Sequence, residues 1–166
     1  MTDRDDWVLA PDSAAFRTVL GHFATGVAIV TAVDDGEPVG MACNSFTSVS
    51  IEPPLVLFCA AKSSTTWPRI QRAGAWAANF LAEDDEQVCR LFATKGADRF
   101  TGLSHSPGAT GAPVLADAIA YVDCRTYAEH DAGDHVLVVG QVERLGYSPH
   151  ASPLLFFRGG YGRFVS

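Results

Sequence analysis

The stretch from residue 38 to residue 66, PVGMACNSFTSVSIEPPLVLFCAAKSSTT, decides how we expect this 166-residue chain to fold. It holds two apolar runs, residues 39–42 and 55–61, and each run ends in a patch of hydroxyl-bearing side chains. Glu52-Pro53-Pro54 separates the two runs, because proline interrupts regular backbone hydrogen bonding. The pattern predicts two strands with polar ends. Hydroxyls, backbone N–H groups and the charge of Lys62 suit the oxygens of one phosphate.

An ordinary turn explains the same polar residues. Short runs of serine and threonine between apolar runs are common in solvated turns. Ser63 or Ser64 can also serve as the N-cap of a helix that begins near Thr65. Without further information, composition favours this turn-and-cap interpretation over a phosphate site.

The composition is that of one folded domain. Hydrophobic residues make up 48% of the chain and charged residues 19%, and 166 residues are enough for a sizeable core. We expect a flexible tail at residues 1–10 and a single domain over residues 11–166. The net charge of −7 argues against nucleic-acid binding. The acidic start is unlike the basic start of a signal peptide, so none is expected. No apolar run is long enough to predict a membrane-spanning helix.

The cysteines and histidines form no metal-binding or redox motif. Four cysteines are widely spaced without a CxxC pair, and five histidines show no HExxH spacing. The sequence therefore predicts no metal site. Free, buried thiols are typical of the reducing cytoplasm, where we expect this protein to be located.

The first part of the chain predicts a helix followed by a β-hairpin. Asp12 or Ser13 fits the N-cap of a helix over residues 13–22. Its apolar residues recur at helical spacing, and we expect this stripe to pack in the core: Phe16, Val19, Leu20 and Phe23. Residues 27–33 and 37–45 predict two antiparallel strands. Asp34-Asp35-Gly36 predicts the turn between them, because glycine readily accepts a positive φ angle.

The rest of the chain predicts more strands and two short helices. Residues 55–61 are almost purely apolar and predict a strand buried on both faces, as in a barrel wall covered by another subunit. Helices are expected over residues 65–72 and from a capping box of Asp84 and Gln87 to residue 94. The long segment over residues 95–116 is expected to be functional. The remaining predicted strands are residues 75–81, 118–130, 135–145, 153–158 and 161–165.

These elements indicate a mainly β protein. Alternation makes residues 118–130 a half-exposed strand, with Asp123 on its more polar face. Six or seven strands with hairpin connections and two or three helices predict an antiparallel barrel. The absence of a regular βαβ alternation makes a Rossmann domain a poor interpretation.

The stretch over residues 38–66 resembles the signature of the flavin reductase family, which includes the reductase components of two-component monooxygenases. Ala42-Cys43 departs from the family pattern, which often has threonine followed by a small residue. The resemblance extends from residue 16 to residue 164 and implies an antiparallel Greek-key fold, the FMN-binding split barrel, and a homodimer. The matching residues are Gly40, Met41, Asn44, Ser45, Phe46, Ser48, Val49, Ser50, Pro53, Pro54 and Leu55.

The resemblance assigns flavin-binding roles to the first polar patch. Backbone atoms of Met41, Ala42 and Cys43 line the isoalloxazine ring in this interpretation. Asn44 and Ser45 hydrogen-bond the ribityl chain or the phosphate.

The second apolar run and the patch after it receive roles in the same way. Phe58, Cys59 and Ala60 form the other wall of the flavin site by resemblance. For Phe58 and Cys59 alone, plain core packing is the favoured alternative. The residues implied at the flavin phosphate are Lys62, Ser64 and Thr65.

A second shared motif is LFATKGADRF, residues 91–100. The resemblance places Phe92 and Lys95 next to the flavin, with Arg99 or Phe100 nearby. The alternative is a helix end where Lys95 faces the helix dipole and Arg99 is solvated.

A third shared motif is Gly133-Asp134-His135, which by resemblance lies near the nicotinamide. His135 is the predicted catalytic residue: it orients the nicotinamide, while hydride passes directly to the flavin. The alternative is a simple hairpin turn in which Asp134 bonds its own backbone. Tyr161 is a further, weaker prediction for stacking near the flavin or the nicotinamide.

Together the motifs imply an NAD(P)H:flavin oxidoreductase that reduces FMN or FAD and supplies reduced flavin to a separate monooxygenase. NADH and NADPH are both left open as reductant. One alternative is a flavoprotein with tightly bound FMN that reduces another acceptor. A third interpretation is a flavin-binding protein without catalysis, since one fold hosts many functions.

Overall fold

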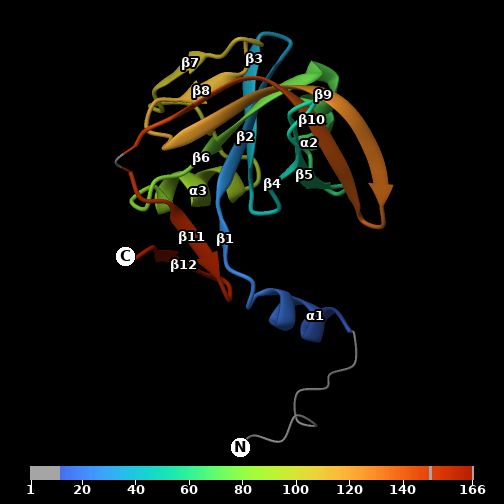
Figure 1. Ribbon diagram of the computed structural model, residues 1–166, viewed down its shortest axis with the longest axis vertical. Coiled ribbons are helices and arrows are strands. Elements are labelled where there is room, and N and C mark those ends of the chain that lie inside the picture. The colour runs from blue at the N-terminus through green and yellow to red at the C-terminus, as the bar shows by residue number, and fades with distance from the viewer. Residues whose placement is uncertain (1–11, 150, 166) are drawn as a thin grey trace, which may run out of the picture.

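A seven-stranded antiparallel sheet forms the body of the molecule (Figure 1). The computed structural model describes residues 12–149 and 151–165, so the expected tail at residues 1–10 lies outside the described residues. The strand order is β3-β2-β6-β9-β10-β5-β4, which leaves β3 and β4 at the edges. The bounds are β2 Ala28–Asp34, β3 Glu37–Cys43, β4 Thr47–Ser50, β5 Leu55–Ala61, β6 Ala75–Phe80, β9 Ala120–Ala132 and β10 His135–Tyr147.

Two smaller sheets and three helices complete the described part of the chain. One sheet has the order β1-β11-β12, with β1 Thr25–Gly26, β11 Leu154–Phe157 and β12 Gly160–Arg163. The other is a short hairpin of β7 His105–Pro107 and β8 Pro113–Leu115. The helices are α1 Ser13–Leu20, α2 Trp67–Ala73 and α3 Glu86–Ala93. The prediction of a mainly β, antiparallel protein with two or three short helices is confirmed.

The β2–β3 hairpin forms as its turn sequence predicts. Asp34 pairs with Glu37, while Asp35 and Gly36 have φ angles of 53° and 79°. Two positive φ angles are typical of the turn whose twist matches a tight hairpin. This turn fixes the register of β3, and the outer edge of β3 has no neighbouring strand in the described sheet.

Aromatic side chains fill the centre of the sheet. The ring of Phe58 lies edge-on to Trp76 and Trp67, with centroid distances of 4.8 and 6.0 Å. Gly140 makes room for this cluster, because a Cβ atom there would lie 2.3 Å from Cζ2 of Trp76. All three aromatic residues are buried, so the core sits directly behind the strands that carry the first sequence motif.

Buried polar side chains attach the β7–β8 hairpin to the sheet. Asn79 accepts a hydrogen bond from the backbone of Leu115 at 2.8 Å, and its amide donates to Thr31 Oγ1 at 3.1 Å. Thr31 Oγ1 in turn donates to the carbonyl of Pro113. Asp123 is fully buried rather than exposed, and it accepts hydrogen bonds from the backbone and hydroxyl of Thr110. A buried carboxylate needs such donors, and here they fix part of the long segment.

The predicted packing of the first helix in the core is wrong. Asp12 caps α1, accepting hydrogen bonds from Ala14 N and Ala15 N at 2.9 and 2.8 Å, but no residue of the helix is buried. The exposed fractions are 60% for Phe16 and 74% for Phe23. The helix lies away from the large sheet, beside β1, β11 and β12 (Figure 1). Helical spacing identifies an apolar face, but it does not identify the surface that covers it.

The single chain buries only one face of β5, and burial of the other face by a second subunit stays a prediction. The burial of β5 alternates: Val56, Phe58 and Ala60 are buried while their neighbours are partly exposed. One face of β5 is therefore open in the single chain.

The start of α3 differs by one residue from the prediction. Asp85 is the N-cap instead of Asp84, and the predicted capping box is not formed. The Asp85 carboxylate instead accepts a hydrogen bond from Ala82 N at 3.2 Å.

Candidate functional site

Two neighbouring cavities lie along β3. The larger measures about 630 Å³ and is lined by residues 37–40 of β3; the smaller measures about 220 Å³ and is lined by Met41 and Ala42. Thr65, Thr66 and Arg99 line both. A strand rises ~3.3 Å per residue, so residues 37–42 extend for roughly 20 Å. The two cavities therefore lie next to each other along β3 and share these walls, and together they are called the groove.

The smaller cavity brings together six of the predicted site residues. β3 contributes Met41 and Ala42, the loop before α2 contributes hydroxyl side chains, and the end of α3 contributes an aromatic ring and an ammonium group. No carboxylate is among the residues that line it. Such a cavity suits an anion attached to a flat, apolar ring. The six predicted residues are Met41, Ala42, Ser64, Thr65, Phe92 and Lys95.

Ser64 bonds the backbone at the start of α2 and also lines the cavity, although the N-cap of this helix is Thr66 and not Ser63 or Ser64 as predicted. Its hydroxyl oxygen accepts hydrogen bonds from Thr66 N at 3.2 Å and Trp67 N at 3.1 Å. These bonds use the oxygen as acceptor and leave the hydroxyl proton available to a ligand. The two interpretations of this motif are therefore compatible, because the turn that starts α2 also directs the Ser64 hydroxyl.

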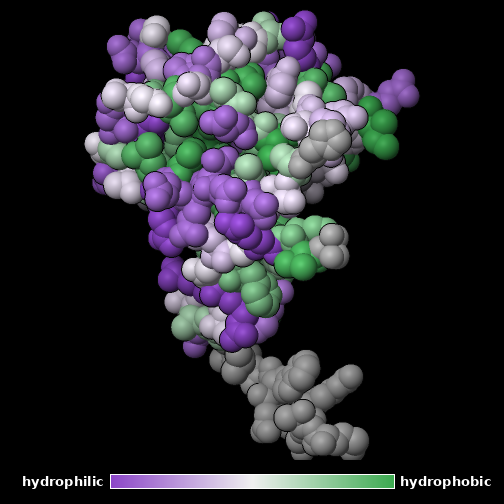
Figure 2. Space-filling model, turned by 90° about the vertical axis from the view of Figure 1, so that its left-hand side faces the viewer, coloured by the Kyte–Doolittle hydropathy of each residue, from purple (hydrophilic) through white to green (hydrophobic). Residues whose placement is uncertain are grey.

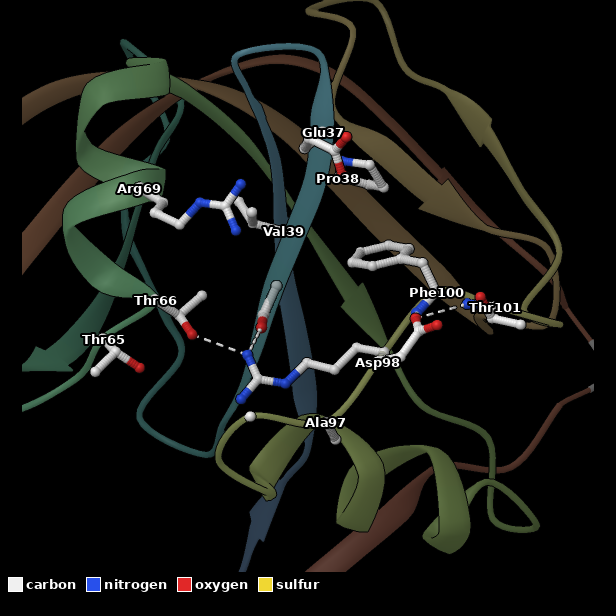
Figure 3. Close-up of a pocket in the computed structure, with 13 residues that line it drawn as sticks. Glu37, Pro38, Val39, Thr65, Thr66, Arg69, Ala97, Asp98, Phe100 and Thr101 are labelled. Carbon is white, nitrogen blue, oxygen red and sulfur yellow. Dashed lines mark hydrogen bonds between the residues drawn. The ribbon is translucent and has the colours of Figure 1, made fainter.

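Arg99 joins the three elements around the groove. Its Nη1 donates to the Gly40 carbonyl at 2.6 Å and to Thr66 Oγ1 at 2.8 Å (Figure 3). Its Nη2 donates to the Thr94 carbonyl at 2.8 Å. Burial lowers the pKa of Arg99, yet a guanidinium stays protonated at neutral pH. Its Nε is buried without a hydrogen-bond partner among the described residues. The groove therefore contains a fixed positive charge.

Sequence reasoning mentioned Arg99 only as a neighbour of the flavin and missed Ser63 and Thr66. The run of residues 97–100, ADRF, contains an acidic turn followed by a basic residue. Asp98 accepts hydrogen bonds from Phe100 N at 3.2 Å and Thr101 N at 3.1 Å. The turn that these bonds form presents Arg99 to the groove. The signal was present, but a basic residue near a helix end has an ordinary alternative.

Several predicted residues lie away from the groove. Phe58 and Ala60 are fully buried in the core. Burial also raises the pKa of Cys43 to about 11, so its thiol is neutral at pH 7. Ser45 accepts a hydrogen bond from Cys59 N at 2.9 Å, which ties β5 to the segment after β3. The predicted roles of these residues, which relied partly on backbone atoms, stay predictions.

Asn44 lines a different cavity. This cavity measures about 240 Å³ and is mainly apolar, with Phe46, Phe80 and Leu154 among its walls. Asn44 therefore does not meet Ser64 or Lys95 within the single chain. Its predicted hydrogen bond to the ribityl chain or phosphate also stays a prediction.

Lys62 bonds to the β9–β10 hairpin instead of lining the groove. Its backbone N–H donates to the Asp134 carbonyl at 2.9 Å, and its Nζ forms an ion pair with Asp131 at 2.7 Å. His135 Nδ1 lies 2.7 Å from Asp134 Oδ1, and this bond holds the pKa of Asp134 below its ordinary value. The third motif thus lies directly beside the start of residues 62–66, the hydroxyl loop between β5 and α2. His135 itself does not line either cavity.

Tyr161 lies near the first part of α3, away from the groove. Its hydroxyl is 3.2 Å from Cys89 Sγ, and Arg90 lies over its ring at 5.0 Å. The hydrogen bond with Cys89 raises the pKa of Tyr161 to about 12. The cavity beside it is lined by Glu83 and Glu86 among others. In the single chain this residue lines neither cavity of the groove, although it packs against the apolar cluster that contains Phe92.

Comparison with known proteins identifies the family. The flavin reductase like domain matches residues 20–164, so the chain belongs to the flavin reductase family. A flavin reductase from Pseudomonas putida is 46% identical over 158 residues, covering 95% of this chain and 93% of its own length. The reductase subunit HsaB of a flavin-dependent monooxygenase from Rhodococcus jostii is 45% identical over 152 residues, or 92% of this chain and 78% of that subunit.

Solved structures agree with this assignment. A nitrilotriacetate monooxygenase component B homologue from Mycobacterium thermoresistibile is 42% identical with a TM-score of 0.90, covering 93% of this chain and 87% of that one. An NADH:FAD oxidoreductase from Streptomyces globisporus, solved with NAD and FAD fragments, is 35% identical with a TM-score of 0.86. That match covers 99% of this chain and 96% of the other.

In the described residues, no helix is long and apolar enough to cross a membrane. No group of three or more metal-ligating side chains is found among those residues.

Proposed function

We propose that the protein is an NAD(P)H-dependent flavin reductase that reduces FMN or FAD and supplies the reduced flavin to a separate monooxygenase. The observation that carries this proposal is the smaller cavity, where the hydroxyl loop, Lys95 and Arg99 meet Phe92 beside β3. The reaction class follows from family membership. The separate oxygenase is supported by the likeness to the Rhodococcus monooxygenase reductase subunit.

The groups in the smaller cavity fit a flavin mononucleotide moiety. Ser64 and Thr65 offer hydroxyl donors, and Lys95 and Arg99 offer positive charge. These are the donors that phosphate oxygens prefer. The Nε of Arg99 is a buried donor without a partner among the described residues. We assign the phosphate to this end of the cavity.

The remaining walls suit the ring of the flavin. Met41 and Ala42 lie on the edge strand, and the two neighbouring cavities follow that edge. Backbone groups at such an edge are available to hydrogen-bond the ring. Phe92 supplies an apolar wall. Within the proposal, Cys43, Asn44, Ser45, Phe58, Cys59 and Ala60 keep their predicted supporting roles.

Bound flavin supplies the redox chemistry, accepting hydride from the nicotinamide, and the protein supplies binding and orientation. His135 is proposed to orient the nicotinamide, with Asp134 holding its ring through the 2.7 Å hydrogen bond. Lys62 helps to hold the β9–β10 hairpin that carries His135, through its ion pair with Asp131. No proton transfer is assigned to His135, because hydride transfer does not require one at this position.

The proposal includes a homodimer. The apolar side chains of α1 are exposed, and in Figure 2 the narrow lower end of the molecule, where this helix lies, shows green hydrophobic atoms among purple hydrophilic ones. One face of β5 is also open. A second copy would bury such surfaces. Size-exclusion chromatography with light scattering should give twice the mass of the 17.7 kDa chain; a monomer at micromolar concentration would contradict it.

Three further properties belong to the proposal. Residues 11–166 form one domain, and the large sheet is a Greek-key split barrel. The contact between β3 and β5, which are not paired, supports a sheet that curls toward closure. The free cysteines support a cytoplasmic protein.

The direct test of the activity is a spectrophotometric assay of NAD(P)H oxidation. Purified protein is mixed with NADH or NADPH and with FMN or FAD, in all four combinations. Rapid oxidation that depends on added flavin is expected in at least one combination. No oxidation in any combination, from protein that still binds flavin, would overturn the reductase and favour a flavin-binding protein without catalysis.

A further inference from the structure

Two stretches of chain that are not paired as strands form opposite walls of the smaller cavity. Met41 and Ala42 belong to β3, and residues 63–66 belong to the hydroxyl loop, which follows β5. β3 lies at one edge of the large sheet, and β5 is not its neighbour in the strand order. No backbone ladder therefore joins the two walls, and their separation depends on the side chains that connect them.

Arg99 makes one connection between the walls. Its Nη1 donates to the Gly40 carbonyl on β3 and to Thr66 Oγ1 in the hydroxyl loop (Figure 3). Gly40 immediately precedes Met41, so this connection lies at one end of the wall that β3 forms. Arg99 also lines the cavity. Its substitution would therefore change the spacing of the walls and a ligand contact together.

Ser45 makes a second connection, from the segment after β3 to β5. Its hydroxyl oxygen accepts a hydrogen bond from Cys59 N at 2.9 Å, and the same hydroxyl donates to the Cys59 carbonyl at 3.3 Å. Ser45 lies shortly after Ala42 in the chain, and Cys59 lies shortly before the hydroxyl loop. Ser45 itself lines neither cavity of the groove. It can therefore be changed without removing a side chain from the cavity wall.

This connection extends the ladder between β4 and β5. The pair of that ladder closest to the cavity is Thr47 with Leu57, and β4 begins at Thr47. Cys59 lies two residues beyond Leu57, so its N–H and C=O point toward the same edge of β5. The Ser45 side chain supplies both hydrogen bonds that a further β4 residue would have made. Backbone groups seek such partners, and here the partner also fixes where β5 leads into the hydroxyl loop.

We propose that Ser45 is a positioning residue that fixes the separation of the two walls of the flavin cavity. Its hydroxyl acts through Cys59 on the hydroxyl loop and does not contact the flavin, because its single proton is already donated to the Cys59 carbonyl. The backbone of Ser45 keeps the supporting role predicted for this residue. This inference rests on the proposed function, because it takes the smaller cavity as the flavin site.

The spacing of the walls should affect the reaction more than it affects flavin affinity. Ser64, Thr65 and Lys95 lie on the hydroxyl loop and at the end of α3, and they keep their contacts with the phosphate when the Ser45 hydroxyl is removed. The flavin ring, however, would move in a wider cavity. Hydride transfer is sensitive to such movement, since a displacement of about 1 Å can lower a rate roughly 100-fold.

Three variants separate positioning from contact and from stability. Ser45→Ala removes both bonds to Cys59, Ser45→Thr keeps a hydroxyl, and Ser48→Ala is the control on the exposed side of β4. In Ser45→Ala, kcat should fall about tenfold while the Kd for flavin stays within about threefold. The fluorescence anisotropy of the bound flavin should also fall. Ser45→Thr should restore both values, and Ser48→Ala should change neither.

Amide hydrogen exchange tests the same bond without flavin. By NMR, the Cys59 amide of wild type should be protected to a similar degree as that of Leu57, which pairs with Thr47. Ser45→Ala should speed exchange at Cys59 at least about tenfold, and Ser45→Thr should not. If Ser45→Ala does not fold, wild type still decides: an unprotected Cys59 amide would overturn the proposal.

Other outcomes would overturn it as well. A tenfold weaker flavin affinity in Ser45→Ala with unchanged kcat would show that the hydroxyl contacts the flavin. A lower unfolding free energy with unchanged kcat, Kd and anisotropy would show a purely structural role.

The positioning role and the reductase activity fail separately. Wild type without NAD(P)H oxidation would remove the reductase, while faster Cys59 exchange and lower flavin anisotropy in Ser45→Ala would keep the positioning role. Rapid oxidation by wild type and by Ser45→Ala at the same kcat would keep the reductase and remove the positioning role.

Discussion

The two halves of the segment over residues 95–116 are held in different ways. Residues 104–116 form the β7–β8 hairpin, which buried Thr31, Asn79 and Asp123 fix to the sheet. Residues 96–101 line the larger cavity, and they are held by the three hydrogen bonds of Arg99 and by the packing of Phe100 on Phe92. One half is thus anchored by the fold, and the other lines the candidate site. The difference predicts that stability and ligand binding can be perturbed independently.

The largest expected effect comes from breaking the anchored half. Asn79→Ala removes the acceptor for Leu115 N and the donor to Thr31 in a fully buried site. Leaving buried polar groups unsatisfied costs about 2–4 kcal/mol of unfolding free energy. Urea denaturation measures this loss, with Gln71→Ala on the exposed face of α2 as control. The flavin affinity of the folded protein should change less than threefold; a stability loss below about 0.5 kcal/mol would show that the anchor is unimportant.

The second-largest effect is expected on flavin affinity, from a substitution in residues 96–101, which line the larger cavity. Arg99→Ala removes the charge between the two cavities and three hydrogen bonds that hold β3, Thr66 and Thr94 around it. Flavin binding should weaken about 10- to 100-fold, since charge-assisted hydrogen bonds contribute about 1.5–3 kcal/mol. Fluorescence titration gives the Kd, and Arg90→Ala on the exposed surface of α3 is the control. Unchanged affinity in Arg99→Ala would contradict the central position of this residue.

A smaller effect is expected at the proposed nicotinamide site, which lies outside both halves of this segment. His135→Ala removes a side chain at the tip of the β9–β10 hairpin, outside the two cavities. Steady-state kinetics should show kcat/KM for NADH falling about tenfold, as expected for loss of an orienting contact. The Kd for flavin should stay within about twofold. Equal losses in both parameters would place His135 in the flavin site instead, and His130→Ala serves as a neighbouring control.

The smallest effect is a dependence of stability on pH. Arg72 and Arg69 hold the pKa of Asp34 below its ordinary value. A lowered folded-state pKa adds stability above the unfolded pKa of about 3.9, and that stability is lost as the pH falls through the folded value. Asp34→Asn should therefore be less stable than wild type at pH 7, and the gap should shrink below about pH 4. Urea midpoints across this range measure it; a constant gap would show that ionisation of Asp34 contributes nothing.

Much of the fold was predictable because local rules decided it. Asp35 and Gly36 fix the β2–β3 hairpin through two positive φ angles, and Asp12 caps α1 with its own side chain. Covered surfaces were harder to predict. The stripe of Phe16, Val19 and Leu20 was correctly recognised as helical but wrongly placed in the core, because periodicity contains no information about which surface lies opposite.

The candidate site was predictable in part for a similar reason. Ser64, Thr65, Phe92 and Lys95 belong to two separate motifs, and the fold brings them to one cavity. The predicted role of Lys62 at the flavin phosphate stays a prediction, and in the single chain its ammonium pairs with Asp131 on a hairpin that is distant in sequence. Such long-range pairing cannot be read from local pattern. Asp123 illustrates the same point, since its buried partner Thr110 lies in another segment.

A crystal structure of the protein with FAD tests the central claim most directly. The account predicts the flavin phosphate beside Ser64, Thr65 and Lys95, and the flavin ring against Met41, Ala42 and Phe92. FAD bound elsewhere, for instance at the apolar cavity that contains Asn44 and Phe46, would contradict it.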